Sequence, residues 1–202
     1  MEAYALTDTG RVRSMNQDYI YASPEKVGSL PDLFLVADGM GGHKAGDYAS
    51  RFMVENLVVY LTHRHDGPCV TQIKEGIKTV NKALYEMSLE REEFKGCTLV
   101  AAVIEDGVLY AANIGDSRLY LIHDGSIRQI TRDHSYVEEM VAMGMMQRGS
   151  ADYNRKKNII TRAAGIRPDI VPDFFEEELE QGDYILLCSD GLSNMVDNDT
   201  LC

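Results

Sequence analysis

The chain has 202 residues, 45% of them hydrophobic, which suffices for one domain, residues 1–202, with a substantial core. Its 32 acidic and 20 basic residues give a formal net charge of −12, which argues against binding to nucleic acid or to an anionic membrane surface. We find no signal sequence and no apolar run near the roughly 20 residues that a membrane span needs, so we expect a cytoplasmic protein.

Apolar patterns predict three strands early in the chain, EAYALTD, DYIYAS and DLFLVAD, which should pair antiparallel. Apolar residues at helical spacing then predict two helices, from Lys44 to about Thr62 and from about Val70 to Leu89. We expect these two helices to cover one face of the sheet.

Residues 98–131 contain two Asp-Gly pairs, Asp106-Gly107 and Asp124-Gly125, each between apolar-rich runs, as in tight hairpins. We therefore expect an antiparallel meander in this segment. A short helix from about Tyr136 to Met143, a basic, glycine-punctuated flap at about 144–165, and strands at DIVPDFF and DYILLCSD should follow. This order predicts an α+β fold of packed sheets flanked by helices and excludes a parallel doubly wound sheet.

Two further Asp-Gly pairs, Asp38-Gly39 and Asp190-Gly191, each follow a short apolar run that is typical of a buried strand. Each carboxylate should lie at the mouth of its strand, where glycine lets the backbone approach a ligand. An isolated Asp-Gly is most often only a turn, and this alternative stays open for each pair taken alone. Two such strand mouths can share a metal ion.

Other kinds of phosphate chemistry are excluded by the residues present. The segment DGMGGHKAG matches neither common glycine-rich phosphate loop, since Lys44 is followed by Ala45. A cysteine-based phosphatase needs an arginine six residues after its nucleophile, and no cysteine of this chain has one. The cysteines also lack the CxxC spacing of zinc sites.

Four motifs, RSMNQD, VADGMGGH, NIGDSRLY and LCSDGL, occur in an order and spacing that resembles one family. The chain is similar, from Thr7 to about Val196, to the metal-dependent serine/threonine protein phosphatases of type 2C in their compact bacterial form. The resemblance implies a four-layer α-β-β-α sandwich of two antiparallel β-sheets flanked by α-helices, with the active site at one end. It also implies hydrolysis of phosphoserine and phosphothreonine on proteins by a metal-activated water, without a covalent enzyme intermediate.

The same resemblance implies a metal site with two magnesium or manganese ions. Asp38 would bridge the ions, the backbone carbonyl of Gly39 would bind one of them, and Asp190 would bind the other. Such a sparse set of oxygen ligands suits magnesium, which keeps several waters. Asp18 would hold water at the site from outside the ligand set. Asp116 would bind a weaker third ion together with Asp190, although a role in bracing a hairpin is equally open.

Arg13 lies five residues before Asp18, at the position of the family's phosphate-binding arginine. A guanidinium suits phosphate because it offers two parallel hydrogen bonds. The general acid stays unassigned, because Met40 follows the first Asp-Gly where animal and plant members carry a histidine. His43 is a nearby candidate, although a histidine in a glycine loop is more often a plain turn residue.

The chain stops at Cys202, before the Gly-Gly-x-Asp-Asn motif that supplies another metal ligand in the family. We therefore expect a domain that is incomplete at its C-terminal end, with weakened metal binding and impaired activity. An unpaired sheet edge would allow an otherwise monomeric chain to self-associate.

The expected partners are phosphorylated proteins, and a serine/threonine kinase would act in the opposite direction. A noncatalytic domain that binds phosphoproteins through Arg13 and the flap is the alternative. A related phosphatase of an anti-sigma-factor pathway would differ only in substrate. The basic flap residues could favour acidic or phosphorylated substrates, or could simply be solvated: Arg148, Arg155, Lys156 and Lys157.

Overall fold

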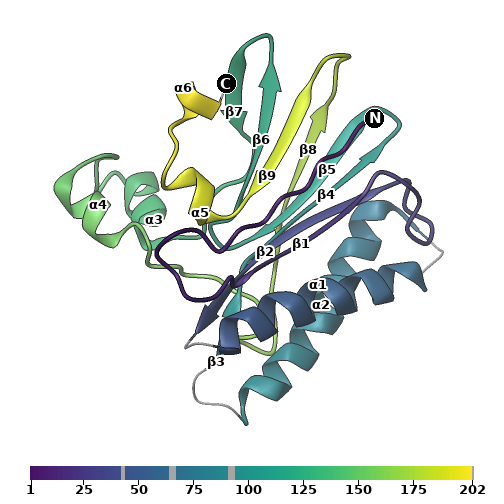
Figure 1. Cartoon of the computed structure of the whole chain (residues 1–202), viewed down its shortest axis with the longest axis horizontal. Helices are drawn as coiled ribbons and strands as arrows, with labels where there is room; N and C mark the ends of the chain where they lie inside the picture. The colour runs from purple at the N-terminus through teal and green to yellow at the C-terminus, as the bar shows by residue number, and fades with distance from the viewer. Residues whose placement is uncertain (42–43, 64–66, 91–93, 202) are drawn as a thin grey trace.

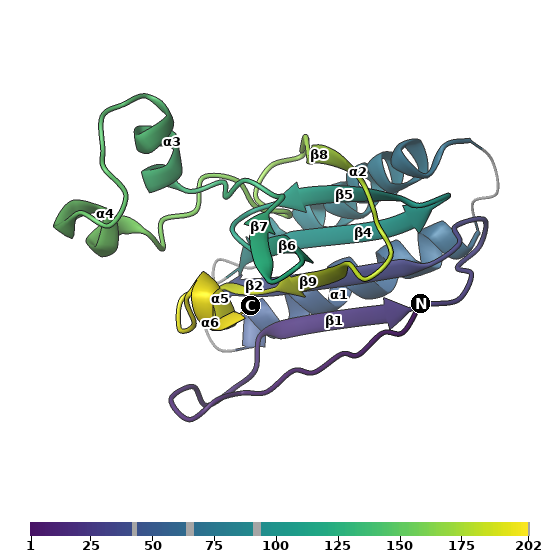
Figure 2. The same cartoon turned by 90° about the horizontal axis from the view of Figure 1, so that it is seen from above.

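The computed structural model describes residues 1–41, 44–63, 67–90 and 94–201. It contains two antiparallel β-sheets with flanking helices, as the sequence predicts (Figure 1). Helices α1 (Lys44–Thr62) and α2 (Cys69–Ser88) match their predicted bounds to within a residue, and both lie on the outer face of the larger sheet (Figure 2). The candidate acid His43 lies outside the described residues.

The larger sheet has the strand order β1-β2-β4-β5-β8. The short strand β3 also pairs with β2, at the end of β2 that β4 does not cover. The smaller sheet has the order β7-β6-β9. The strands of the larger sheet are β1 (Asp18–Ser23), β2 (Leu33–Gly41), β3 (Phe94–Cys97), β4 (Leu99–Glu105), β5 (Val108–Ile114) and β8 (Asp173–Glu178). Those of the smaller sheet are β6 (Arg118–His123), β7 (Ser126–Gln129) and β9 (Tyr184–Cys188).

Strand β4 is buried on both faces because it lies between the helices and the smaller sheet. Leu99, Ala101 and Val103 belong to the core beneath α1 and α2. Val100 and Ala102 point the other way, into the core between the two sheets. The two-residue period of a strand thus divides one apolar run between two cores, which fixes the stacking of the layers.

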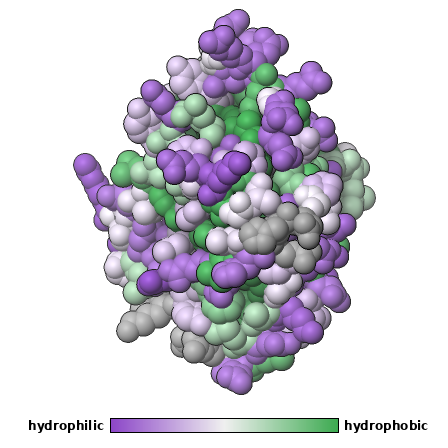
Figure 3. All heavy atoms as spheres, turned by 90° about the vertical axis from the view of Figure 1, so that its right-hand side faces the viewer, coloured by the Kyte–Doolittle hydropathy of each residue, from purple (hydrophilic) through white to green (hydrophobic). Residues whose placement is uncertain are grey.

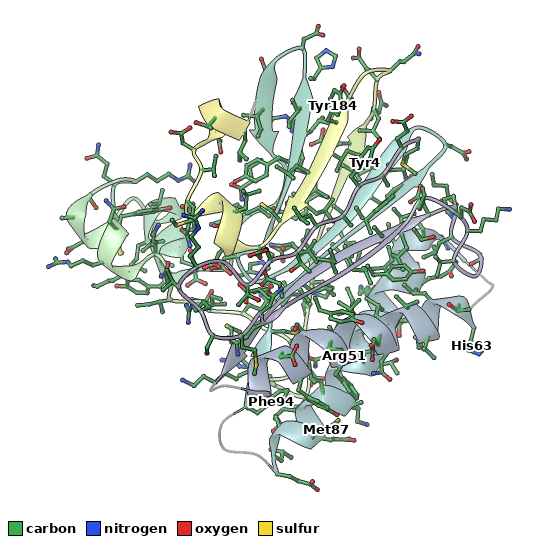
Figure 4. All side chains as sticks on the ribbon, in the orientation of Figure 1. Tyr4, Arg51, His63, Met87, Phe94 and Tyr184 are labelled. Carbon is green, nitrogen blue, oxygen red and sulfur yellow. The ribbon has the colours of Figure 1, made fainter. Side chains whose placement is uncertain are left out.

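The N-terminal prediction was wrong in part, because residues 2–8 form no strand. Only DYIYAS and DLFLVAD pair, as β1 and β2. Tyr4, which is labelled in Figure 4, and Leu6 are 91% and 90% exposed. Alternation of apolar residues is a local signal, whereas a strand also needs a partner for its backbone groups. None of the described strands pairs with this segment.

Both predicted Asp-Gly hairpins are present, with positive φ at Asp106 and Asp124 as such two-residue turns require. The predicted single meander is wrong, however. Strands β4 and β5 belong to the larger sheet, whereas β6 and β7 belong to the smaller one. The chain changes sheets between Ile114 and Arg118, and this corner carries Asp116.

The flap follows the predicted short helix, which is α3 (Tyr136–Ala142). Its segment 144–165 is more than a loop, because it contains α4 (Ala151–Lys156). Ser150 caps this helix by accepting a 3.2 Å hydrogen bond from the backbone N–H of Tyr153. Helices α3 and α4 project from one end of the sandwich in both views (Figures 1 and 2).

The C-terminal elements lie beside the smaller sheet. The predicted strand DIVPDFF begins only at its last three residues, since β8 starts at Asp173. After β9 come the short helices α5 (Asp190–Ser193), which contacts β9, and α6 (Asn198–Leu201), which contacts β7. A long helix on the outer face of the smaller sheet is not among the described elements.

The face of the molecule drawn in Figure 3 is largely polar. Figure 3 shows one face on which hydrophilic side chains predominate and hydrophobic atoms lie in small areas between them. None of the helices in the described part of the chain is long and apolar enough to cross a membrane.

Candidate metal and phosphate site

The structure brings the four predicted aspartates together from four separate places in the chain. Asp18 is the first residue of β1 and lies opposite Asp38 of β2 in the antiparallel ladder. Asp116 lies in the corner between β5 and β6, and Asp190 is the first residue of α5. Figure 4 shows side-chain oxygens gathered between α5 and the start of β1. Asp38 is the central member, because its side chain contacts those of both Asp18 and Asp190.

The electrostatics of this cluster call for a positive charge. Burial, and then the neighbouring charges of Asp18, Asp190 and Asp116, raise the pKa of Asp38 well above its usual value. Burial, and then Asp190, raise the pKa of Asp116 to about 7. Burial also raises the pKa of Asp18. Carboxylates held this close repel one another unless protons or cations lie between them.

The donor set fits a divalent cation with hard, oxygen-loving chemistry. Among the described residues, no group of three or more His, Cys, Asp or Glu side chains is arranged so that it could hold a metal ion by itself. Water would therefore have to complete the coordination, which is the habit of magnesium in sites with one or two carboxylates. The aspartate cluster suits an open hydrolytic site better than a structural one.

Thr98 supports Asp38, and sequence reasoning missed it. The backbone N–H of Asp38 donates to Thr98 Oγ1 at 2.9 Å, and the N–H of Thr98 donates to the carbonyl of Asp38 at 2.8 Å. Thr98 Oγ1 also lies 2.7 Å from the hydroxyl of Ser117, beside Asp116. Thr98 thus links the strand that carries Asp38 to the corner that carries Asp116. Because Thr98 is far along the chain from Asp38 and Ser117, no local sequence pattern indicates that it supports the site.

Gly39 is required by a close approach of β2 to the first turn of α1. A Cβ at this position would lie 1.9 Å from the carbonyl oxygen of Gly46. A Cβ at Gly46 would in turn lie 2.7 Å from the carbonyl oxygen of Gly39. The flexible residue after Asp38 is therefore explained by packing as well as by any ligand role of its carbonyl.

The turn that carries Asp116 is held by His134, a second residue that the sequence did not indicate. Gly115 has φ +99° and donates its N–H to Nδ1 of His134 at 3.0 Å. The N–H of His134 donates back to the Gly115 carbonyl at 2.9 Å. Because Nδ1 accepts, the neutral ring carries its proton on Nε2, which lies 3.1 Å from a carboxylate oxygen of Asp173.

A cavity of about 180 Å³ adjoins the aspartates on the side of the flap. Asp116, Asp190 and Asn194 line it together with Tyr153 and Lys157 of the flap. Asn194 Nδ2 donates a 3.0 Å hydrogen bond to Asp190 Oδ2. Lys157 Nζ donates to Asn194 Oδ1 at 2.8 Å. The flap therefore reaches the acidic cluster through a side-chain relay.

Arg13 lies exposed in the loop before β1. It makes no hydrogen bond or ion pair with another described residue, so its guanidinium is available to an anion. The neighbouring Asn16 is fixed on both sides, by a 2.7 Å bond to Thr7 Oγ1 and by a 3.0 Å bond from the N–H of Asp18. The loop is thus anchored at the start of β1, and Arg13 remains unpaired within it.

The family profile of protein phosphatase 2C matches residues 9–201. The chain belongs to the protein phosphatase 2C family. It is therefore a protein phosphatase of the serine/threonine class, as its four motifs predict.

Relatives and solved structures support this assignment along nearly the whole chain. A putative protein phosphatase 2C-type of Streptococcus pyogenes is 40% identical over 100% of this chain and 82% of its own length. The serine/threonine phosphatase of S. agalactiae has a TM-score of 0.88 and 35% identity, over 97% of this chain and 82% of its own. The catalytic domain of the phosphatase PstP, solved with two manganese ions, has a TM-score of 0.79 and 31% identity, over 96% of this chain and 79% of its own.

Proposed function

We propose that this chain hydrolyses phosphoserine and phosphothreonine in proteins, and that Asp38 and Asp190 hold two manganese or magnesium ions for this reaction. The proposal rests on the contacts of the half-buried Asp38 side chain with both Asp18 and Asp190. The related PstP domain was solved with two manganese ions, which supports the same chemistry here.

Each residue of the site has a distinct task. Asp38 would contact both ions, with the Gly39 carbonyl on one and Asp190 on the other. When bound, the two cations would lower the pKa of a water and neutralise charge on the phosphoryl oxygens. Asp18 would orient water by accepting its hydrogen bonds, since it lies directly opposite Asp38. Asp116 would hold a weaker third cation with Asp190, across the cavity that both line.

Arg13 would bind the phosphoryl group of the substrate. Its free guanidinium can donate two parallel hydrogen bonds to non-bridging oxygens, which fixes phosphorus for attack. During hydrolysis the oxygen of water bonds to phosphorus while the bond from phosphorus to the serine or threonine oxygen breaks. A proton passes to that oxygen, and the products are inorganic phosphate and the free hydroxyl. This chemistry leaves no covalent intermediate on the protein.

The substrates would be proteins phosphorylated by a serine/threonine kinase in the same cytoplasm. The domain would use the segment 144–165 as its flap, because α4 lies over the cavity beside Asp190. Phosphopeptides with different flanking charges, compared between the chain and a variant with Arg148, Arg155 and Lys156 changed to Gln, test the flap. Equal preferences in the two proteins would contradict a role of its charge in substrate choice.

The alternative is a domain that binds phosphoproteins without turnover. Binding of a phosphothreonine peptide at the same strength by Asp38→Asn, with no manganese-dependent release of phosphate by the unchanged chain, would favour it. Phosphate release that needs both manganese and Asp38 would exclude it.

A further inference from the structure

Lys157 is the flap residue that reaches the aspartate cluster. It follows directly after α4, and its ammonium donates to Asn194 Oδ1 at 2.8 Å. Asn194 passes the connection on, because its Nδ2 donates to Asp190 Oδ2 at 3.0 Å. The amide is thus oriented from both sides, with its oxygen toward the flap and its nitrogen toward the carboxylate.

The neighbouring basic residues of α4 are engaged elsewhere. Arg155 pairs with Asp152 of the same helix. The Lys156 ammonium lies 5.3 Å from the centre of the Tyr136 ring, in a cation–π contact with α3. Lys157 lines the cavity and contributes a positive charge to it, whereas Arg155 and Lys156 do not line it.

The position of this ammonium conflicts with a divalent cation in the same cavity. Asp116 and Asp190 line the 180 Å³ space together with Lys157. An amide oxygen is a good ligand for a hard cation, but here the oxygen of Asn194 already accepts from Lys157. A cation beside Asp116 and Asp190 would also be repelled by the ammonium at short range.

We propose that Lys157 is a positioning residue that makes docking of α4 and binding of a third cation by Asp116 and Asp190 mutually exclusive. With α4 docked, the ammonium adds a positive charge to a cavity that Arg118, paired with Asp133, also lines, and it holds Asn194 against Asp190. When a divalent cation enters, Lys157 leaves Asn194 and α4 loses its link to α5. The inference rests on the proposed roles of Asp116 and Asp190 in the phosphatase site.

Manganese binding tests this competition without any assay of turnover. Electron paramagnetic resonance measures the concentration of free manganese during a titration. The titration separates tight binding sites from weak ones, and the weak class is the site proposed at Asp116 and Asp190. In Lys157→Met the weak class should bind about three- to tenfold more tightly, because a like charge is removed from a partly solvated site. Lys157→Arg should bind as the unchanged chain does. The matched control, Lys156→Met, removes the same charge one residue away and should leave the weak class unchanged.

Hydrogen exchange of the amides in residues 151–157 provides the second readout. In the unchanged chain, exchange should accelerate as manganese fills the weak class. In Lys157→Met it should be fast at all manganese concentrations. The inference would be overturned if the weak class bound manganese equally well in Lys157→Met and the unchanged chain. It would also be overturned if the exchange rates in α4 did not change with manganese.

Asp116→Asn separates failure of this inference from failure of the proposed function. Loss of the weak class in this variant, with the tight class kept, supports the competition. A weak class that survives Asp116→Asn would overturn the inference while leaving the two-metal site intact. Absence of all manganese binding in the unchanged chain would contradict the proposed function and the inference together.

Discussion

Ser189 Oγ donates a 2.7 Å hydrogen bond to Asp18 Oδ2, which joins the residue after β9 in the smaller sheet to the first residue of β1 in the larger sheet. The two residues are 171 positions apart, and Ser189 is 8% exposed. The bond stabilises the charged form of Asp18 against the effect of burial, and so lowers its pKa toward the usual value. The two sheets are thus tied together at the aspartate cluster.

Ser189→Ala should weaken manganese binding by about tenfold, the size typical of removing a group that orients a ligand from outside. Asp18 would lose the donor that fixes its carboxylate opposite Asp38. Calorimetric titration with manganese measures the effect. The control is Ser126→Ala, which removes a hydroxyl from the exposed first residue of β7. Equal manganese affinity in Ser189→Ala and the control would contradict the role given to this bond.

Asp38→Asn should make the metal-free protein more stable, by about 1–2 kcal/mol in the free energy of unfolding, because a buried charge among like charges is removed. In excess manganese the order should reverse, since a ligand at about 100 times its Kd adds about 2.7 kcal/mol only to a protein that binds it. Urea unfolding in EDTA and in manganese measures both values. Asp106→Asn, at an exposed hairpin, should change neither. Equal stability gains from manganese in Asp38→Asn and the unchanged chain would refute the prediction.

Arg13→Ala should lower kcat/KM for a phosphothreonine peptide by about 10- to 100-fold, because a charge-assisted pair of hydrogen bonds to phosphate is lost. Arg13→Lys should recover part of this loss, since an ammonium keeps the charge and loses the planar pair of donors. Arg11→Ala is the matched control and should behave as the unchanged chain. A larger loss in Arg11→Ala than in Arg13→Ala would contradict the prediction and point to Arg11 as the phosphate-binding arginine.

Glu138 should give the flap a stability that depends on pH. Burial alone would raise the pKa of this carboxyl, but hydrogen bonds from Arg148 and from Tyr153, the latter at 2.7 Å, hold the pKa below its usual 4.5. A lowered pKa means that the contribution is fully present above pH 4.5 and is lost as pH falls through the folded value.

Glu138→Gln should therefore cost about 1 kcal/mol of unfolding free energy near pH 7, a modest value because Arg148 is largely exposed. The difference from the unchanged chain should shrink as the pH falls below 4.5. Urea unfolding across this range measures it, with Glu139→Gln on the exposed side of α3 as control. A difference that stays constant with pH would show that the carboxylate charge is not responsible.

Sequence patterns predicted the elements whose signals are local. The bounds of α1 and α2 follow from helical spacing, and the hairpins at Asp106 and Asp124 follow from turn chemistry. The strand expected at residues 2–8 failed because pairing depends on a partner that a local pattern does not specify. The prediction of a single meander was wrong at Asp116, where the chain changes sheets. Apolar-rich runs lie on both sides of this corner, and this pattern is the same whether the strands belong to one sheet or to two.

The site shows the same division. Asp18, Asp38, Asp116 and Asp190 were predicted by their motifs, and the structure brings them together. Thr98, His134 and the relay from Lys157 through Asn194 come from distant segments and act through hydrogen bonds. Nothing in their own neighbourhoods distinguishes them from ordinary polar residues, so only the folded chain reveals them.

Hydrolysis should depend on cations held by Asp38, and the release of phosphate from a phosphothreonine peptide measures this dependence. The rate should be measured against manganese concentration for the unchanged chain, Asp38→Asn and Asp106→Asn. We expect release that rises with manganese and vanishes in EDTA, with a loss of about 100-fold or more in Asp38→Asn and none in Asp106→Asn. Release that persists in EDTA, or that is equal in Asp38→Asn and the unchanged chain, would contradict it.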